Sequence, residues 1–424
     1  MSFAASLSGL TSASTAIDII GNNIANQQTY GFKSSKGRFS DVLAASLPGA
    51  PPASGASAGV SISLIRQSDQ GSFFRSDNPL DVAIAGPGFF RLDKGGDITY
   101  TRDGRFTLGY DAANPDQTFL VNQTGSNVTG NGVTYTTDPK GVVVTGTAPQ
   151  KITIDPVMPA KATSKVSVGV NLDARVASPA AAFDSTNPTT YNSTTALTVF
   201  DSKGASHDLR MYFAKPAAGS VWNLHTTLDD GSPTGPLALS FGTDGLLTTP
   251  MPLAPQNYTV EGGVSLQVAL DFSGATQYGI AFNGDALTQN GWKKGEIQSA
   301  AGFSVGRDGV ITGTYSNGQS RTVAQLVLAN FINPDAMIDV GDAQWKANTD
   351  PVRGSGLEIL DTPGKGKGGK GLGSVQGGTR EQSNVDLSKE LVSLIEQQRN
   401  YQASAQTFKI LDQVLQNLAN MAAR

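Results

Sequence analysis

The sequence contains no cysteine, which excludes disulfide bonds and metal sites built from thiolates. Charged residues make up only 16% of the 424 residues, whereas an average soluble domain has about 25%. The net charge of -4 argues against the strongly basic surface that binding to nucleic acid requires. A surface poor in charge is typical of proteins that bury much of their surface against neighbours, and equally of exported β-rich proteins.

Long hydrophobic runs are also missing from the chain. No apolar run approaches the roughly 18 residues that would span a bilayer as a helix. The N-terminus lacks the basic segment of a secretory signal, because the first basic residue is Lys33. If the protein leaves the cell, we expect it to do so without a cleaved signal peptide.

Residues that carry catalytic chemistry are scarce. The 2 histidines, His207 and His225, lie in separate predicted β segments without an acidic cluster around either, so a surface or turn role is favoured over catalysis or metal binding. No Gly-x-Ser-x-Gly elbow occurs with a plausible histidine partner. We therefore predict no enzymatic activity, no cofactor, no metal and no small-molecule substrate.

A glycine- and lysine-rich tract at residues 364–371 comes closest to a ligand-binding motif. Gly364 and Gly369-Lys370 have the spacing of a phosphate-binding loop. However, Gly371 stands where a Ser or Thr should reach the magnesium ion, and no helix N-terminus follows to complete the anion site. The composition favours a flexible basic linker, and a nucleotide site would depend on this tract alone.

Proline is absent from both ends of the chain, since all 21 prolines fall between Pro48 and Pro363. Both ends therefore permit long helices. Residues 384–424 also lack glycine and repeat apolar side chains at an interval of seven, which predicts an amphipathic helix with a coiled-coil-like seam. The seam consists of Leu387, Leu394, Tyr401, Phe408 and Leu415, flanked by Leu391 and Leu418.

The N-terminal end repeats this pattern. Phe3, Leu10, Ile17 and Ile24 are spaced by seven, and Leu7 lies beside them. We predict that the two terminal helices pair as a coiled-coil-like base. Because one such pair would leave part of its apolar surface exposed, neighbouring molecules are expected to cover the rest.

The middle of the chain is predicted to be β-structure. Alternating segments such as residues 60–64 and Asn-Gly or Asp-Gly pairs across the region favour antiparallel hairpins. The predicted fold class is α+β multidomain, with two mainly antiparallel β-domains nested between the helices. The predicted parts are 1–33 and 379–424 (helical core), 34–69 and 363–378 (linkers), 70–150 and 283–362 (β-rich middle domain), and 151–282 (inserted outer β-domain).

Two short signatures carry a family resemblance. Residues 21–33 read Gly-Asn-Asn-Ile-Ala-Asn-Gln-Gln-Thr-Tyr-Gly-Phe-Lys, and residues 383–387 read Ser-Asn-Val-Asp-Leu. They resemble the N- and C-terminal signatures of the bacterial flagellar axial proteins, the rod and hook subunits. Residues 100–107 (Tyr-Thr-Arg-Asp-Gly-Arg-Phe-Thr) and 270–278 are similar to hook subunits in particular.

The resemblance implies a structural subunit without enzymatic activity. Hook subunits assemble helically into a curved, flexible tube outside the cell, a universal joint that connects rod to filament and transmits motor torque. They pass through the flagellar type III export apparatus. The implied partners are many copies of the chain itself and the rod, hook cap and hook–filament junction proteins. In the family, the terminal helices form an inner coiled-coil core.

These expectations define two sets of candidate residues. The predicted assembly interface consists of Phe3, Leu7, Leu10, Ile17, Ile24, Leu387, Leu391, Leu394, Tyr401, Phe408, Leu415 and Leu418. The predicted cap or hinge after the first helix consists of Asn22, Asn23, Asn26, Gly31 and Phe32. Two alternatives stay open: a distal rod subunit, which should lack the inserted domain or hold it in shorter form, and a secreted β-rich adhesin.

Overall fold

The computed structural model divides the chain into two units. It describes residues 3–43, 57–67, 69–110, 117–135, 141–144, 148–217, 220–260, 263, 265–297, 299–352, 354–364 and 372–422. Unit 1 comprises Met1–Asp155, Ser299–Thr314 and Ser320–Arg424, and unit 2 comprises Pro156–Gln298 and Tyr315–Gln319. The chain thus leaves unit 1, builds unit 2 and returns. The division into four parts stays a prediction.

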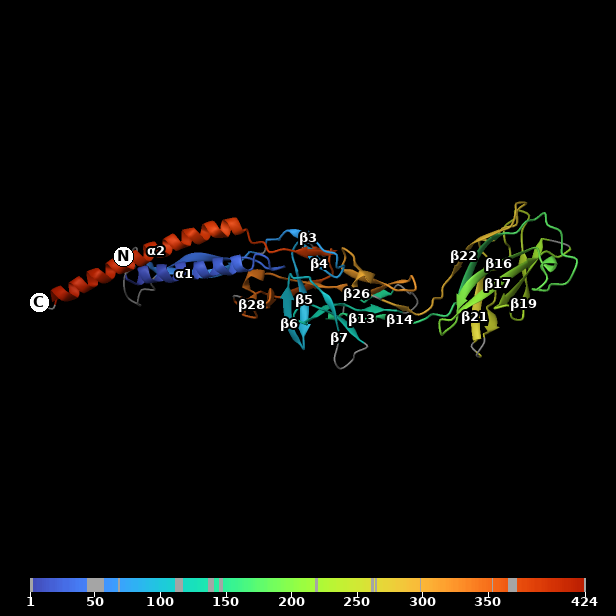
Figure 1. Cartoon of the computed structure of the whole chain (residues 1–424), viewed down its shortest axis with the longest axis horizontal. Coiled ribbons are helices and arrows are strands. Elements are labelled where there is room, and N and C mark those ends of the chain that lie inside the picture. The colour runs from blue at the N-terminus through green and yellow to red at the C-terminus, as the bar shows by residue number, and fades with distance from the viewer. Residues whose placement is uncertain are drawn as a thin grey trace. The chain divides into compact units, whose positions relative to one another are not determined.

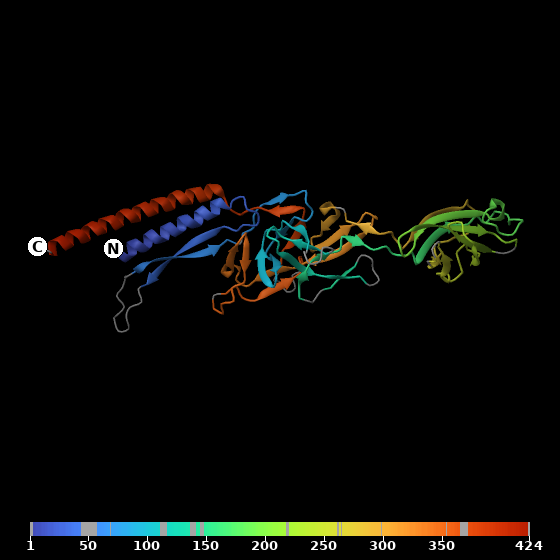
Figure 2. The ribbon, with the colours of Figure 1, turned by 60° about the horizontal axis from the view of Figure 1, so that its bottom comes forward.

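The protein is mostly β-structure, with one long helix near each end (Figure 1). Helix α1 spans Phe3–Ala25 and helix α2 spans Leu387–Ala422, so both predicted terminal helices are confirmed. In unit 1 they lie side by side and run in opposite directions (Figures 1 and 2). No helix in the described part of the chain is long and apolar enough to cross a membrane.

A β-hairpin follows α1 in place of a predicted linker. Strand β1 (Ser35–Leu43) pairs antiparallel with β2 (Ser57–Arg66), and both contact α1. The linker prediction for 34–69 is wrong here, although the strand expected at 60–64 lies within β2. Strand β1 was not predicted, because apolar and polar side chains do not alternate cleanly in residues 35–43. These residues form a strand through their hydrogen bonds to β2. The Pro/Gly/Ala stretch at 47–56 lies outside the described residues.

A 14-stranded sheet forms the body of unit 1. Its main path runs β24-β25-β26-β9-β5-β6-β29-β28, and neighbouring strands pair antiparallel. Phe89 and Trp345 pack edge to face with ring centroids 5.6 Å apart, as do Tyr100 and Phe331 at 4.8 Å. The strands are β5 (Phe89–Lys94), β6 (Asp97–Thr101), β7 (Thr107–Tyr110), β8 (Thr118–Val121), β9 (Asn127–Asn131), β12 (Gln150–Lys151), β13 (Thr153–Ile154), β24 (Phe303–Val305), β25 (Val310–Thr314), β26 (Ser320–Leu326), β27 (Leu328–Phe331), β28 (Ile338–Gly341), β29 (Gln344–Lys346) and β30 (Glu358–Asp361).

Smaller strand pairs connect this sheet with the start of α2. Strand β3 (Phe73–Arg75) pairs with β32 (Thr379–Glu381), and β4 (Val82–Ala85) pairs with β31 (Ser374–Gly377). The end of the predicted linker 363–378 is therefore a strand. It could not be predicted from the local sequence, because its partner β4 lies almost 300 residues earlier.

Residues 365–371 of the lysine/glycine tract lie outside the described residues. Short elements complete unit 1: β10 (Val133–Thr134), β11 (Val142–Val143), η2 (Ala300–Gly302) and η3 (Pro334–Ala336).

Unit 2 contains two four-stranded sheets, with strand orders β20-β21-β15-β22 and β16-β17-β18-β19. Buried side chains from both sheets join in one apolar cluster that includes Phe213, Trp222 and Phe272, each 0% exposed. The elements are β14 (Val157–Met158), β15 (Lys165–Asn171), η1 (Pro188–Thr190), β16 (Ser193–Phe200), β17 (Ser206–Ala214), β18 (Val221–Leu228), β19 (Thr234–Ser240), β20 (Gln256–Thr259), β21 (Ser265–Asp271), β22 (Asn283–Gln289) and β23 (Gly295–Glu296).

Candidate assembly surface and its junction with the sheets

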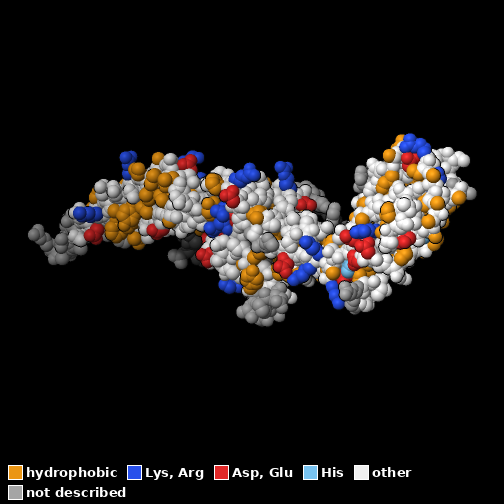
Figure 3. All heavy atoms as spheres, turned by 45° about the vertical axis from the view of Figure 1, so that its right-hand side comes forward, with side chains coloured by type: hydrophobic (Ala, Val, Ile, Leu, Met, Phe, Trp, Pro, Cys, Tyr) orange, Lys and Arg blue, Asp and Glu red, His pale blue; other side chains and the backbone are white. Residues whose placement is uncertain are grey.

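Helix α2 presents an open apolar face. Among its side chains that the structure describes, none is buried, although fully buried apolar side chains are what normally hold a helix in place. Figure 3 shows hydrophobic side chains gathered over the helical end of unit 1. The large exposed ones on α2 are Leu391 (44%), Val392 (66%), Ile395 (53%), Tyr401 (38%), Ile410 (60%) and Val414 (48%).

The predicted seam of α2 is only partly covered within the subunit. Leu387, Leu394 and Phe408 are half-buried, whereas Leu391 and Tyr401 are exposed. The side chains of Leu415 and Leu418 lie outside the described residues. The exposed set also includes Val392 and Ile395, which the seven-residue interval did not single out. The apolar surface is therefore broader than one stripe.

The buried face of α1 differs from its predicted stripe. Leu10, Ile17 and Ile24 are half-buried and Leu7 is 43% exposed, while the side chain of Phe3 lies outside the described residues. The most buried apolar positions are Ala13 (4%), Ala16 (6%) and Ile20 (8%). Because α1 contacts the hairpin as well as α2, two neighbours instead of one determine which positions are buried.

Helix α2 is longer than the helix that accompanies it. It has 36 residues and α1 has 23, so at about 1.5 Å per residue α2 is roughly 20 Å longer. Gly9 of α1 lies against Ser404, since a Cβ on Gly9 would be 3.5 Å from the Ser404 hydroxyl oxygen. Because the helices are antiparallel, α1 begins near residue 410 of α2. The final turns of α2 therefore have no described α1 residue opposite them.

At its other end, α1 is fixed by asparagine side chains. The buried Asn23 amide donates to the carbonyl oxygen of Ser35 (2.8 Å), and its Oδ1 accepts from the Ser35 N–H (2.9 Å). Asn26 Nδ2 donates to the carbonyl oxygen of Asn22 (3.0 Å), which also accepts from the Asn26 backbone N–H (3.1 Å). Asn23 thereby ties the last turn of α1 to the first residue of β1.

Three buried charges hold the segment after α1 to the segment before α2. Lys33 Nζ lies 2.7 Å from Glu381 Oε1, and Arg102 Nη1 lies 3.2 Å from Glu381 Oε2. The side chains are 2%, 0% and 5% exposed for Lys33, Glu381 and Arg102. Lys33 also donates to the Asp69 carbonyl (2.8 Å), and the Gly71 N–H donates to Glu381 Oε1 (3.1 Å). Segments 348 residues apart thus share one ion cluster.

Burial and charge act in opposite directions on these groups. Burial lowers the pKa of Lys33, and the Glu381 carboxylate opposes that effect only in part. The pKa of Arg102 is lowered for the same reason. Because an unpaired buried charge is costly, the two cations depend on Glu381 to stay in the interior.

The backbone around Gly31 approaches its neighbours too closely for a side chain. Gly31 has a φ of 70°, and its N–H donates to the Glu381 carbonyl (2.9 Å). A Cβ at this position would lie 2.4 Å from the Asp103 nitrogen. Next to it, the Ser34 N–H donates to Asn384 Oδ1 (2.7 Å).

Two guanidinium groups hold the ring of Tyr30. Arg105 and Arg380 lie 5.0 and 5.4 Å from the ring centroid, within the range of cation–π attraction. Arg380 in turn pairs with Asp81 at 2.6 Å, and Phe32 is half-buried. Together with the ion cluster, these contacts bring residues 21–33, 100–107 and 379–384 to one place, which we call the junction.

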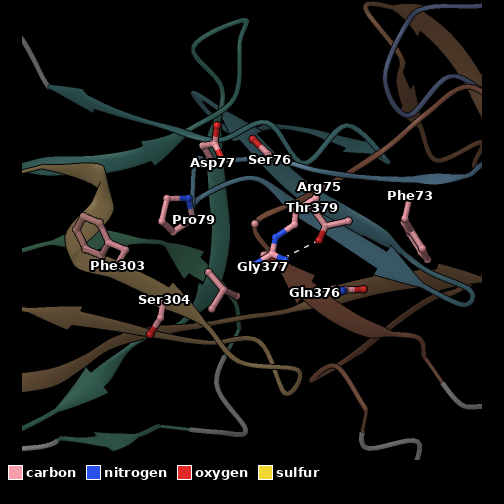
Figure 4. A pocket seen from close by; sticks show the side chains of 12 residues that line it. Phe73, Arg75, Ser76, Asp77, Pro79, Phe303, Ser304, Gln376, Gly377 and Thr379 are labelled. Carbon is pink, nitrogen blue, oxygen red and sulfur yellow. Dashed lines mark hydrogen bonds between the residues drawn. The ribbon is translucent and has the colours of Figure 1, made fainter.

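Unit 1 also contains a groove beside β3 and β24, with a volume of about 630 Å³. In Figure 4, Arg75 and Asp77 come from the β3 side, and Phe303 and Ser304 come from β24. Its two charged groups are of opposite sign, and they do not converge on a ligand-binding centre. In the described part of the chain, no group of three or more His, Asp or Glu residues is placed to hold a metal ion.

In unit 2, His207 has acidic neighbours that the sequence interpretation missed. Its Nδ1 lies 2.6 Å from Asp229 Oδ2, and its Nε2 lies 3.7 Å from Asp201 Oδ2. Burial raises the pKa of Asp229, but the Asp208 N–H and His207 outweigh burial and lower it. The prediction that His207 has no acidic cluster around it is therefore wrong, because a neighbouring strand end supplies Asp229. His225 instead stacks on Phe183, with ring centroids 4.0 Å apart.

Four family models match the chain. They are "Flagella basal body rod protein" (residues 3–33), "Flagellar hook protein FlgE/F/G D1 domain" (83–172), "Flagellar basal body protein FlaE D2 domain" (171–292) and "Flagellar basal body rod FlgEFG protein C-terminal" (376–421). The first and last matches coincide with the helical ends. The D2 match lies entirely within unit 2.

Curated relatives match over nearly the whole length. The flagellar hook protein FlgE of Salmonella typhimurium is 37% identical over 431 residues, covering 99% of this chain and 100% of the relative. FlgE of Escherichia coli shows the same identity and coverage. The crystal structure of Helicobacter pylori flagellar hook protein FlgE2 is 15% identical, with a TM-score of 0.49, covering 72% of this chain and 99% of that one.

Proposed function

The chain belongs to the flagellar hook protein family and is a hook subunit, and on that basis we propose that the open face of α2 is where its copies join. The copies assemble helically into a curved, flexible tube that connects rod to filament and transmits torque. The inserted unit 2 and its D2 match favour the hook over the distal rod subunit.

The observation that carries the proposal is the lack of cover over α2. A helix of 36 residues without a buried side chain among those described gains little from packing within its own subunit. Each large apolar side chain that becomes fully buried contributes about 1.5–3 kcal/mol. Six exposed ones on a single helix therefore offer a large gain when a second subunit covers them.

The contact surface that we propose includes the seams of both helices. In the tube, α1 and α2 pack as coiled coils with helices of neighbouring subunits and form the inner core. The seam residues are Phe3, Leu7, Leu10, Ile17, Ile24, Leu387, Leu391, Leu394, Tyr401, Phe408, Leu415 and Leu418. Val392 and Ile395 extend this surface on the exposed side of α2.

The signature residues have a supporting role in this proposal. Asn22, Asn23, Asn26, Gly31 and Phe32 form the cap and joint between α1 and the sheets. The bonds from Asn23 to Ser35 and the buried ion cluster support a joint with little freedom. Bending of the tube then occurs between subunits, not within the junction.

Family membership supports the remaining parts of the proposal. The subunit has no enzymatic activity and is exported by the flagellar type III apparatus without a cleaved signal peptide. It functions outside the cell in the hook and basal body. Besides its own copies, its partners are the rod, the hook cap and the hook–filament junction proteins.

Electron microscopy of charge variants tests the proposal. Leu394→Asp and Ile395→Asp each place a carboxylate on the apolar surface of α2, and we expect both to prevent tube formation at concentrations where the unchanged protein assembles. Gln402→Asp adds the same charge at an exposed polar position and should still form tubes. Thermal unfolding of unit 2 should be unchanged in all three. Normal tubes from both Leu394→Asp and Ile395→Asp would contradict the proposal.

A further inference from the structure

Strand β28 is an open edge of the large sheet. It stands last in the strand order and, among the described residues, pairs only with β29. All four of its residues are exposed, and its alternating apolar side chains Ile338 and Val340 are 52% and 46% exposed. An exposed edge with apolar side chains readily pairs with another chain, and proteins normally cover or charge such edges.

Strand β1 offers a second open edge with a different character. In the described residues it pairs only with β2, and α1 packs on the hairpin. Lys36, Arg38 and Phe39 are exposed, Phe39 by 48%. This edge therefore combines two cations with one aromatic ring.

The two edges are complementary in charge and in shape. The exposed carboxylates Asp339 and Asp342 lie in β28 and directly after it. When Asp339 faces Arg38 in an antiparallel pair, Ile338 falls opposite Phe39, since paired residues project from the same face. In this register the large Ile338 and Phe39 side chains meet, and Val340 falls opposite the small Gly37.

We propose that β28 of one subunit adds to the free edge of β1 in a second copy of this chain, with Asp339 opposite Arg38. The proposal rests on the assembly described above. The two edges are different surfaces of unit 1, so each copy can donate β28 to one neighbour and accept a strand from another. Contacts of this head-to-tail kind generate open helical arrays instead of closed dimers.

Two other edges of unit 1 are less suitable acceptors. On the β24 side, the carbonyl oxygen of Arg307, just after β24, already accepts a hydrogen bond from the Val375 N–H (3.1 Å). An added strand would have to displace this contact. Strand β3 borders the groove of Figure 4, where Arg75 and Asp77 oppose each other in charge. An acidic strand would gain less there than beside β1.

Cysteine cross-linking tests the pairing directly, because the chain has no cysteine of its own. Directly opposed residues in an antiparallel pair have Cβ atoms about 4.5–5.5 Å apart, close enough for a disulfide after a small adjustment. We expect assembled tubes of the double variant Phe39→Cys/Ile338→Cys to give a ladder of disulfide-linked multimers on oxidation. The control pair Phe74→Cys/Ile338→Cys, which tests the β3 edge, should give none.

Mixing the single variants Phe39→Cys and Ile338→Cys separates links between copies from links within one copy. The mixture should yield dimers and nothing longer. Tubes that form without a Phe39→Cys/Ile338→Cys ladder, or that give an equal ladder with the control pair, would overturn the pairing but leave the assembly proposal intact. Failure of the unchanged protein to form tubes would overturn both.

A charge exchange keeps the inference testable if the cysteine variants do not assemble. Arg38→Asp or Asp339→Arg alone should raise the concentration needed for tube formation by roughly fivefold, since like charges then face each other. The double exchange should return it to within about twofold of the unchanged protein. Purely additive effects of the two changes would overturn the pairing.

Discussion

The junction of unit 1 and the core of unit 2 both exclude water, but they do so with different chemistry. The junction buries Lys33, Glu381 and Arg102, whereas the core of unit 2 buries aliphatic and aromatic side chains such as Trp222. The hydrophobic effect has no directional preference, so burial of apolar side chains stabilises many packing arrangements about equally. Buried ions stabilise only when each finds its partner, so the junction selects one arrangement of the two chain ends.

This difference fits what each region has to do. Unit 2 is held together by a large apolar cluster. The junction sets the position of α1 and α2 on the sheets, and the proposed assembly surface lies on those helices. If stability and positioning are divided in this way, substitutions in the two regions should have different effects.

The largest loss of stability is expected for Trp222→Ala in the core of unit 2. Trp222 is 0% exposed, and removal of a buried aromatic side chain costs about 3–5 kcal/mol because a cavity remains. Hydrogen exchange should show the loss in unit 2, while amides of the junction keep their protection. Trp292→Ala, at a half-buried tryptophan, serves as the control and should cost less. Equal losses would mean that Trp222 does not hold the core.

The next effect concerns the buried anion of the junction. Glu381→Leu leaves Lys33 and Arg102 without a counter-charge and the Gly71 N–H without its acceptor. We expect unit 1 to lose about 3 kcal/mol, measured as faster hydrogen exchange at residues 31–34 and 69–71. In the double variant Lys33→Met/Glu381→Leu, the loss should be smaller than the sum of the single losses.

A surface ion pair provides the control for that experiment. Glu296 pairs with Lys294, and both side chains are more than half exposed (58% and 59%). Glu296→Leu should therefore leave the unfolding of either unit unchanged. If Glu381→Leu behaved in the same way, the ion cluster would contribute nothing to the junction.

The sequence was sufficient to predict the two terminal helices but not the contacts of the junction. Proline-free ends and seven-residue spacing predicted α1 and α2, because both signals are local. The partners in the ion cluster are 348 residues apart, and no local pattern reveals that Lys33 meets Glu381. The two signatures marked the right segments through family resemblance, while the reason for their residue types became visible only in three dimensions.

The errors have related physical causes. The β1 strand was missed because its pairing with β2 overrides a weak local preference. The buried positions Ala13 and Ile20 differ from the predicted stripe because α1 has two neighbours. The acidic partner of His207 comes from Asp229, 22 residues later in the chain. In each case a contact outside the local window determines the outcome.

A smaller effect separates two glycines of the N-terminal region. Gly31→Ala should destabilise the junction by about 2 kcal/mol, because the positive φ disfavours any side chain and the new Cβ would strike the Asp103 backbone. At Gly21, within α1, a new Cβ meets nothing within 4 Å, and Gly21→Ala should stabilise the helix by about 0.5–1 kcal/mol. Denaturant unfolding of unit 1 measures both, and equal effects would show that space at Gly31 is not limiting.

A further small effect is a pH dependence in unit 2, where charge contributes little beside the apolar core. Asp271 accepts hydrogen bonds from Lys165 (2.8 Å) and the Ser273 hydroxyl (2.6 Å), which lower its pKa to about 2. A lowered pKa in the folded state contributes stability above the ordinary carboxyl value, and this contribution disappears as the pH falls from about 4 to about 2. Because the Lys165 side chain is 49% exposed, solvent screening reduces the expected loss to about 1 kcal/mol.

The urea midpoint of unit 2 at pH 5 and pH 2.5 measures this contribution, and Asp271→Asn should make the difference between the two midpoints smaller. Asp173 has a similarly low pKa of about 2 beside Arg175. Because the Arg175 side chain is 65% exposed, compared with 49% for Lys165, solvent screening is stronger there, and Asp173→Asn should reduce the difference less than Asp271→Asn does. If Asp271→Asn kept the full difference, the acid sensitivity of unit 2 would have to come from other carboxylates, such as Asp201 and Asp229 beside His207, whose pKa values are also lowered. Unit 2 would then depend on paired charges more than its apolar core suggests, and the contrast with the junction would become one of degree.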